Sequence, residues 1–498
     1  MSRKDQVNVS RREYNLETVV FSAEQEVTVP ASVTIPEGTQ YMLQPVLMLP
    51  KDRITIAQGP GKIRVQGELE GVLSCVGSAE EVCTLPVPAL EFMAAFTAPD
   101  LGPDVRLEAD MHFDGVEAGL SEGNVANITA YIVISLRALQ TQGVEIVNAV
   151  KGGDLLAETN SVRVQSIMEE IASQQNISMQ LALPPETAPA ATELCIGNLS
   201  WQVEEGSLTA EGIVLAKVYC LSGEGKLALL TGRQEFRFEM DFAAPEVRES
   251  SLDCVFDKVS LKTVDEGAAL ELNLVLQARA KGYSQQVAEY VSSIDGADSQ
   301  QTKIQLRNRI GESEFKLNLE GNCPLVSSPQ DIGLVMPRVR ITETQALEGK
   351  ILLRGLLALN IFYTDDNGTS RVLVQEEEFS QLLDLPGSLR GYGVKCWVWP
   401  EGAACSQGRY SVPVLVRVEV FEDVEFTAVT DVHVVDPSHI PAAASVILYT
   451  VQKGDSLFSL ARRFNTTQEL LREYNNLAGD EGLVPGERLI IPVYQIKN

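Results

Sequence analysis

The sequence contains no long hydrophobic run. Its longest apolar stretch lies near residues 131–136, whereas a helix needs about 20 apolar residues to cross a bilayer. Charged side chains such as Arg11, Arg12, Glu13 and Glu17 interrupt the first twenty residues, so no secretion signal is predicted. We therefore expect the protein to remain in the cytoplasm of the cell that makes it.

Cysteine and histidine are scarce. The 498 residues include eight cysteines, none of them in a Cys-x-x-Cys pair, and this density is too low for a disulfide-based fold. Cys75, Cys220 and Cys323 fall on apolar strand faces, which is typical of buried free thiols. Three histidines cannot supply a His-rich metal site, so neither a metal nor a cofactor is predicted. The complete set of cysteines is Cys75, Cys83, Cys195, Cys220, Cys254, Cys323, Cys396 and Cys405.

Basic residues are strongly outnumbered. The chain has 40 Lys and Arg against 68 Asp and Glu, which gives a formal net charge of −28. This charge argues against nucleic-acid binding and against adsorption to anionic lipid through a basic surface. A hydrophobic content of 45% with 22% charged residues is nevertheless that of a folded chain, not of a disordered acidic tail.

The common catalytic motifs are also missing. The sequence has no Gly-x-Ser-x-Gly elbow, no phosphate loop and no Gly-x-Gly-x-x-Gly turn after a strand. His112 and His433 lie in strand-like segments, where a lone histidine is usually structural. Acidic residues are so numerous that two carboxylates could lie together by chance. The composition therefore does not exclude a glycosidase site, although no motif marks one. Trp397 and Trp399 share one strand face and could stack on a sugar or a partner, but packing within the sheet is favoured.

Self-similar stretches indicate an internal repeat. Three segments align on Gly67, Gly212 and Gly355, which are 145 and 143 residues apart. Each segment alternates apolar and polar residues with period two, as a β-strand does. A glycine in the middle of such a strand predicts a bend, a bulge or a close approach of another backbone.

Further landmarks recur around each glycine. An alternating strand that ends at a proline precedes the glycine, a Phe-x(6)-Pro element follows it, and another alternating strand closes each copy. Many such strands separated by turn signals predict a β-sandwich in each copy. The prolines are Pro36, Pro184 and Pro324, and the Phe-x(6)-Pro elements begin at Phe92, Phe238 and Phe379.

The expected fold class is therefore mainly β, with three tandem β-sandwich-like repeats followed by a small α/β unit. With their connectors, the repeats are expected to occupy residues 1–143, 144–290 and 291–441. The connectors are expected near residues 141–176 and 284–314. Residues 166–172 within the first connector are predicted to form a short helix.

A different module follows a linker at residues 442–446. Residues 447–493 show a βααβ pattern, with strands expected at 448–451 and 489–491. The first helix is expected to begin at Asp455 or Ser456, and Thr466 with Glu469 predicts a capping box for the second. The core-facing positions of the two helices are expected to be Leu457, Leu460, Ala461, Phe464, Leu470, Leu471 and Tyr474.

This tail is electrically neutral. From Val446 onward the sequence has six basic and six acidic residues, so the repeats carry the whole net negative charge. A body of this kind is expected to prefer basic partner surfaces.

The tail resembles a LysM domain in the order and spacing of its motifs. These are Tyr449-Thr-Val, Gly454-Asp-Ser-Leu, Leu460-Ala-x-x-Phe, an asparagine near the end of the second helix, and Pro485-Gly-x-x-Leu-x-Ile-Pro. The resemblance implies binding of β-1,4-linked N-acetylglucosamine glycans, such as peptidoglycan or chitin, between two loops. For Asp455, a helix cap is an equal alternative. The implied groove residues are Gly454, Asp455, Ser456, Leu457, Leu483, Val484, Pro485 and Gly486.

Three such repeats followed by a LysM domain resemble the SipL-type spore coat assembly proteins, whose repeat is the SPOCS domain. The resemblance implies a non-enzymatic protein of the mother-cell cytoplasm that acts at the forespore surface. Its implied partner is the morphogenetic ATPase of the coat basement layer, and its implied role is to anchor or encase the coat. The first repeat departs from the family pattern at Glu80, Glu81 and residues 100–104.

Two other functions are weighed against this one. A protein that binds peptidoglycan or another N-acetylglucosamine glycan through its LysM domain is the main alternative. A cell-wall hydrolase is disfavoured, because three similar modules suggest multivalent binding whereas an enzyme needs one site.

Overall fold

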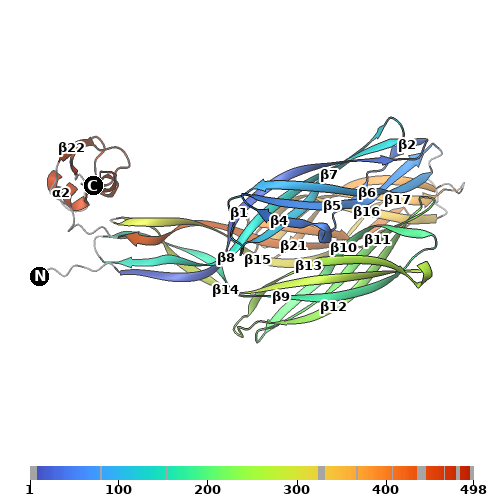
Figure 1. The fold of residues 1–498 in the computed structure, drawn as a ribbon, viewed down its shortest axis with the longest axis horizontal. Coiled ribbons are helices and arrows are strands. Elements are labelled where there is room, and N and C mark those ends of the chain that lie inside the picture. Colours follow the sequence, from blue (N-terminus) through green and yellow to red (C-terminus); the bar gives the residue numbers. More distant parts are fainter. Residues whose placement is uncertain are drawn as a thin grey trace.

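The long axis of the molecule is formed by six unusually long β-strands (Figure 1). They form three antiparallel pairs, and in each pair one strand opens a repeat and the other closes it. The pairs are β1 (Asn8–Thr34) with β8 (Val125–Lys151), β9 (Leu156–Ala182) with β14 (Ala269–Asp295), and β15 (Asp298–Asn322) with β21 (Arg409–His433). The computed structural model describes residues 8–78, 81–152, 155–295, 297–323, 331–365, 368, 370–406, 408–433, 445–464, 466–477 and 483–493.

The three pairs join into one sheet. Leu16 of β1 faces Ser166 of β9, and Thr18 of β1 faces Leu306 of β15, which makes β1 the link between all three repeats. The outer strands β7 (Arg106–Ser121), β13 (Glu249–Val264), β19 (Gly393–Pro400) and β20 (Ala404–Ser406) complete a ten-stranded sheet.

Each repeat folds a second sheet over its part of the large one, which confirms the predicted sandwiches. The apolar faces of the two layers form one core in each repeat, built for example around Leu69, Val214 and Leu357. The second sheets consist of β2 (Thr39–Met42), β3 (Val46–Met48), β4 (Thr55–Gly59), β5 (Lys62–Gly77) and β6 (Val82–Thr97), then β10 (Thr187–Glu204), β11 (Ser207–Ser222) and β12 (Leu227–Asp241), then β16 (Asp331–Leu347), β17 (Lys350–Thr364) and β18 (Ser370–Asp384). Two short 3-10 helices, η1 (Lys51–Arg53) and η2 (Asp265–Gly267), lie in the connections.

The helix predicted at residues 166–172 is wrong, because this segment lies inside β9. Residues 141–176 and 284–314, expected as connectors, are largely the paired ends of β8, β9, β14 and β15. The reason is long-range pairing, since β14 satisfies the backbone of β9 along nearly its whole length. The expected domain boundaries at residues 143 and 290 fall within β8 and β14, and they stay predictions.

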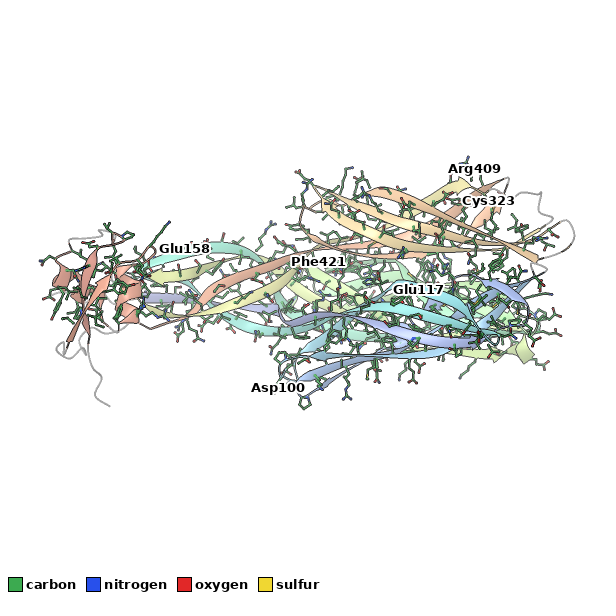
Figure 2. All side chains as sticks on the ribbon, turned by 90° about the horizontal axis from the view of Figure 1, so that it is seen from above. Asp100, Glu117, Glu158, Cys323, Arg409 and Phe421 are labelled. Atoms are coloured by element: carbon green, nitrogen blue, oxygen red, sulfur yellow. The ribbon has the colours of Figure 1, made fainter. Side chains whose placement is uncertain are left out.

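Beyond the sandwiches the long strands continue as a narrow bundle, here called the stalk (Figure 1). Figure 2 shows Glu158 near the free end of the stalk, and Cys323 and Arg409 at the opposite end of the molecule. All three repeats contribute to the apolar interior of the stalk, so none of them can bury its share alone. Its buried residues are Tyr14, Leu16, Ile146, Val147, Val164, Ala288, Val291, Ile294, Ala297, Ile304, Leu306, Phe426, Ala428 and Val429.

The three aligned glycines are confirmed as points of close approach: a phenylalanine ring lies over each, and at Gly355 the backbone oxygen of Arg340 is equally close. A Cβ on Gly67 would lie 2.8 Å from the ring of Phe92, and one on Gly355 would lie 2.5 Å from the ring of Phe379. In repeat 2 the ring over Gly212 belongs to Phe236, two residues before the Phe238 that the motif spacing aligned. Each ring therefore covers the bare backbone of the glycine that faces it across the ladder.

Replacing Gly355 by valine is expected to destabilise the protein by about 2–3 kcal/mol, because overpacking displaces the Phe379 ring. The carbonyl oxygen of Arg340, 2.6 Å from the same Cβ position, cannot move without disturbing β16. Chemical denaturation measures the change. Gly311 is the matched control, because a Cβ there meets no atom within 4 Å and its variant is expected to be near neutral. Equal effects at the two glycines would contradict this explanation.

The tail adopts the predicted βααβ fold. It comprises β22 (Ser445–Thr450), α1 (Leu457–Arg463), α2 (Gln468–Asn475) and β23 (Arg488–Val493). The capping residue of α2 is Thr467, not Thr466, because the Thr466 N–H still donates to the Ala461 carbonyl oxygen in the turn after α1. Tyr474, expected to face the core, is 42% exposed.

Candidate functional site

The tail is built around a small apolar core. The antiparallel pair β22 and β23 packs against α1 and α2, and the loop after β22 leads directly into α1. The buried residues come from α1, α2, β23 and the position directly after β22, so the core fixes the two loops that flank it. They are Val451, Leu457, Leu460, Ala461, Leu471, Leu489 and Ile491.

Ser456 is the capping residue of α1. Its Oγ accepts a hydrogen bond from the Ser459 N–H at 3.1 Å, and the Ser459 Oγ accepts one from the Ser456 N–H at 2.9 Å. This reciprocal pair satisfies two backbone donors at the start of the helix. Of the two residues considered for the cap, Ser456 is therefore the one used.

Asp455 closes the loop between β22 and α1. Its Oδ2 accepts hydrogen bonds from the Gln452 N–H at 2.7 Å and from the Tyr449 hydroxyl at 2.9 Å. Desolvation and this carboxylate raise the pKa of Tyr449. The guanidinium of Arg463 lies 5.6 Å from the centre of the Tyr449 ring, which ties α1 to the same loop. Asp455 thus fixes the shape of the loop instead of capping the helix.

Backbone hydrogen bonds hold the two loops side by side. The Gly486 N–H donates to the Val451 carbonyl oxygen at 2.8 Å, and the Val451 N–H donates to the Glu487 carbonyl oxygen at 2.8 Å. Gly454 and Gly486 turn the loops with φ values of +97° and +96°, a conformation that glycine adopts at low cost. The two edges of the predicted groove are therefore neighbours with a defined spacing.

The structure places the eight predicted groove residues in these two loops, but not all of them are accessible. Leu457 is only 9% exposed and belongs to the core, Leu483 is half-buried against it, and Asp455 is half-buried in its loop. Their assignment to a glycan groove stays a prediction. The exposed members are Gly454, Ser456, Val484, Pro485 and Gly486.

Sequence reasoning missed the side chains that shape the loops. Tyr449 and Arg463 hold the loop after β22, as described above. Asn475, noted only as a family feature, donates from Nδ2 to the Ile490 carbonyl oxygen at 2.7 Å and accepts from the Ile490 N–H at 2.6 Å. Its Nδ2 also donates to the Leu471 carbonyl oxygen at 2.7 Å. A polar residue at the end of a helix beside a strand was the available signal.

The three repeats surround a partly open cavity of about 2440 Å³ that residues from all of them line. The lining holds 12 of the 40 basic residues but only 14 of the 68 acidic ones. This leaves 28 basic against 54 acidic residues in the rest of the chain, so the molecule outside the cavity is more strongly acidic than the average. A larger fraction of the basic residues than of the acidic ones therefore lines the cavity, where the repeats meet.

Ion pairs or cation–π contacts cross every boundary between repeats. Lys281 of repeat 2 pairs with Glu17 of repeat 1 at 2.5 Å, and Lys395 of repeat 3 pairs with Asp110 of repeat 1. The Lys217 ammonium of repeat 2 lies 4.3 Å from the centre of the Trp399 ring of repeat 3. Burial lowers the pKa of Lys217, although Glu193 opposes this effect.

The two tryptophans differ in their surroundings. Trp399 is 6% exposed and packs with Leu215 and Leu415 between repeats 2 and 3, as the packing interpretation favoured. Trp397 is 40% exposed and faces the cavity. Trp399 therefore helps to join repeats 2 and 3, whereas Trp397 lies on the cavity wall beside Arg417 of its own repeat.

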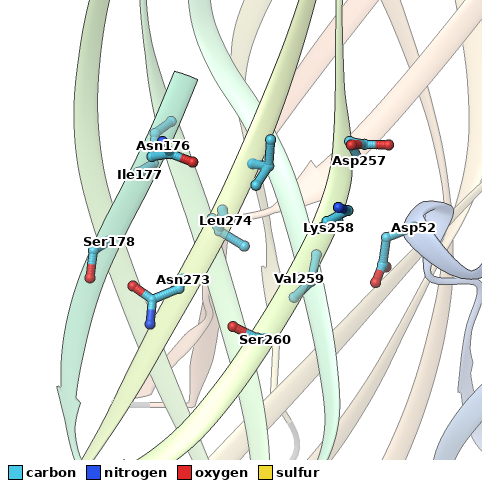
Figure 3. A pocket seen from close by; sticks show the side chains of 11 residues that line it. Asp52, Asn176, Ile177, Ser178, Asp257, Lys258, Val259, Ser260, Asn273 and Leu274 are labelled. Carbon is cyan, nitrogen blue, oxygen red and sulfur yellow. The ribbon is translucent and has the colours of Figure 1, made fainter. Parts of the chain in front are cut away.

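A smaller hollow of about 630 Å³ lies between η1 of repeat 1 and strands β9, β13 and β14 of repeat 2 (Figure 3). Asp52 and Lys258 border it, together with the amides of Asn176 and Asn273. Burial raises the pKa of Asp52. These polar groups line a groove between two repeats.

The described residues contain no group of three or more His, Cys, Asp and Glu side chains placed to hold a metal ion. Among the helices of the described part, none is long and apolar enough to cross a membrane.

Two segments match known family models, which confirms the resemblances inferred from the motifs. Residues 330–406 match the SipL, SPOCS domain, and residues 449–492 match the LysM domain. No curated protein and no solved structure gives a significant match to the chain. Both matched families are non-catalytic binding domains. At family level they support a glycan-binding adaptor connected with sporulation and the spore coat.

Proposed function

We propose that the protein is a non-enzymatic adaptor of spore coat assembly. In this proposal the three repeats bind the ATPase of the coat basement layer at the forespore surface, in the cytoplasm of the mother cell. The LysM domain supplies a second attachment, to a glycan or to another protein.

The observation that carries the proposal is the combination of two separate binding parts in one chain. One part, here called the head, consists of the three mutually supporting repeats and has an acidic exterior. The other is a small neutral domain with two exposed, hydrogen-bonded loops. The family matches add a SPOCS domain to the first part and a LysM domain to the second. Joining two attachments in one chain is what an adaptor requires, because each raises the effective concentration of the other.

The acidic exterior indicates the kind of surface that the head recognises. Complementary charge accelerates association and selects partners, and salt screens it with a length of about 8 Å at physiological ionic strength. We therefore expect the ATPase to present a basic surface to the head. Capture of the ATPase by the full chain should weaken as the salt concentration rises.

The test uses the tagged full chain in sporulating cells. A ring around the forespore, together with recovery of the coat ATPase on the tag, is the expected result. An even distribution through the mother cell with no ATPase recovered would overturn the adaptor proposal.

The alternative is a peptidoglycan- or N-acetylglucosamine-binding protein that acts through the LysM loops alone. Calorimetric titration of the full chain with chitin or peptidoglycan oligomers tests it, and no heat of binding at millimolar ligand would exclude it. Gly486→Val separates the two functions, because the positive φ of Gly486 disfavours a β-branched side chain and distorts one loop. This variant should lose glycan binding and still recover the ATPase.

A further inference from the structure

Two cysteines face each other at the closed end of the β5–β6 hairpin in repeat 1. Cys75 on β5 is the direct partner of Cys83 on β6, and both are free thiols. Directly opposed residues of an antiparallel ladder point to the same face of the sheet. We propose that this pair is a redox modification site, at which Cys75 and Cys83 form a reversible disulfide.

The neighbouring pair shows that the two strands are in register beside the cysteines. The hydroxyl oxygens of Ser74 and Thr84, one position further from the turn, are 2.8 Å apart. On the other side, the Gly77 N–H donates to the Glu81 carbonyl oxygen at 2.9 Å and closes the hairpin. The two strands are thus held in register on both sides of the cysteines.

The hydrogen-bond pattern defines the geometry of the cysteine pair. The Thr84 N–H donates to the Gly225 carbonyl oxygen in repeat 2, and the Ser74 carbonyl oxygen accepts from the Leu43 N–H on the far side of β5. Ser74 and Thr84 therefore do not bond to each other, and the adjacent Cys75 and Cys83 are the hydrogen-bonded pair. Such pairs have Cα atoms about 5.5 Å apart, within the range of about 4.4–6.8 Å found in disulfides.

The same geometry makes the bond easy to reduce. Opposed Cβ atoms of a hydrogen-bonded pair lie about 5.5 Å apart, whereas a disulfide usually holds them about 3.5–4.5 Å apart. Closing this gap strains the hairpin, and strained disulfides are the labile, regulatory kind. The bond is therefore a switch and not a permanent cross-link.

Four other cysteines have no cysteine opposite them in the described ladders. In the described ladders Cys195 faces Leu215, Cys254 faces Ala278 and Cys396 faces Val418. Cys220 lies between Pro189 and Ala228 in its sheet. These thiols serve as internal controls.

Cys83 is the entry point for the chemistry, because it is half-buried whereas Cys75 is 2% exposed. The Cys83 thiolate attacks a sulfur of a small disulfide such as oxidised glutathione, and one glutathione thiolate leaves. The Cys75 thiolate then attacks Cys83 Sγ and releases the second glutathione. The two cysteines lose two protons and two electrons, and the glutathione disulfide takes them up. Burial raises the pKa of Cys75 to about 11 and also raises that of Cys83, so both steps should accelerate as the pH rises from 7 to 9.

Oxidation would act where repeats 1 and 2 touch. A Cβ on Gly225 would lie 2.4 Å from Cys83 Sγ, which places this sulfur against the turn after β11. Forming the bond draws Sγ toward β5 and away from that turn. The contact between the two repeats would therefore loosen around residues 222–226.

The experiment incubates the full chain with oxidised glutathione, then counts free thiols in denaturant and maps linked peptides. We expect the count to fall from eight to six, a single link between Cys75 and Cys83, and full reversal by dithiothreitol. Cys220→Ser should still lose two thiols, whereas Cys83→Ser should form no internal link. A different link, a chain-to-chain link, stable glutathione adducts or eight unchanged thiols would each overturn the proposal. Peptide mapping of the unsubstituted chain decides the matter even if the Cys83 variant folds poorly.

Discussion

Replacing Glu17 by leucine is expected to lower the free energy of unfolding by about 3–5 kcal/mol, the usual cost of leaving a buried charge without its partner. Glu17 on β1 lies 2.5 Å from the Lys281 ammonium on β14, and the Lys281 side chain is only 7% exposed. Glu17 also lies 3.1 Å from Arg106, so a second cation loses a partner. Urea unfolding of the full chain, followed by tryptophan fluorescence, measures the change in the head, where all three tryptophans lie.

A double-mutant cycle distinguishes the lost pair from a general disturbance. Glu17→Leu combined with Lys281→Met should cost clearly less than the sum of the single substitutions, because the double variant buries no unpaired ammonium. The matched control is Asp384→Leu, since Asp384 pairs with Lys350 on the surface, where the side chains are 80% and 51% exposed. That variant should change the stability by less than about 1 kcal/mol. A loss at Glu17 no larger than at Asp384 would contradict this account.

The contacts between repeats explain why such a pair matters. Each sandwich has its own apolar core, but the boundaries between sandwiches combine ion pairs around the cavity with an apolar stalk that all three repeats share. A repeat cut out of the chain would expose its part of the stalk and leave charges such as Lys281 without partners. The three repeats are therefore expected to fold as one cooperative unit and not as three independent domains.

Sequence periodicity predicted what depends on local pattern. The sequence correctly predicted the strands around Gly67, Gly212 and Gly355 and the four elements of the tail. The reason is that strand alternation and helix caps depend on residues close together in the sequence. The helix predicted at residues 166–172 failed because its backbone pairs with β14, more than a hundred residues away. Local propensity cannot anticipate a partner strand at that distance.

The same distinction between local sequence pattern and long-range pairing applies to the side chains. Motif spacing selected Phe238 as the repeated aromatic of repeat 2, yet strand register places Phe236 over Gly212. The pairs that join the repeats, such as Lys281 with Glu17, connect residues with no pattern in common. In the tail, the motifs located both loops of the predicted groove, whereas the supporting role of Tyr449 and Arg463 needed three dimensions.

Replacing Asn475 by alanine is expected to destabilise the LysM domain markedly while leaving the three repeats intact. The Asn475 amide makes two hydrogen bonds to the backbone of Ile490 and one to the Leu471 carbonyl oxygen, so it ties α2 to β23. Its loss should cost about 2 kcal/mol, since each such bond contributes about 1 kcal/mol or less at a partly exposed site. A domain of this size has little stability to spare, because it buries a small fraction of its surface.

Amide hydrogen exchange of the full chain measures this directly. Protection in residues 445–493 should fall roughly thirty-fold, as 2 kcal/mol corresponds to that factor, while protection in β8 and β14 stays unchanged. Asn476→Ala is the neighbouring control; its φ of +52° makes it mildly strained as alanine, but its side chain is exposed. Because β23, which contains Ile490, directly follows the loop at residues 483–487, the Asn475 variant should also lose any glycan binding by the full chain. Unchanged exchange in the tail would show that the core of the domain, and not this amide, holds α2 against β23.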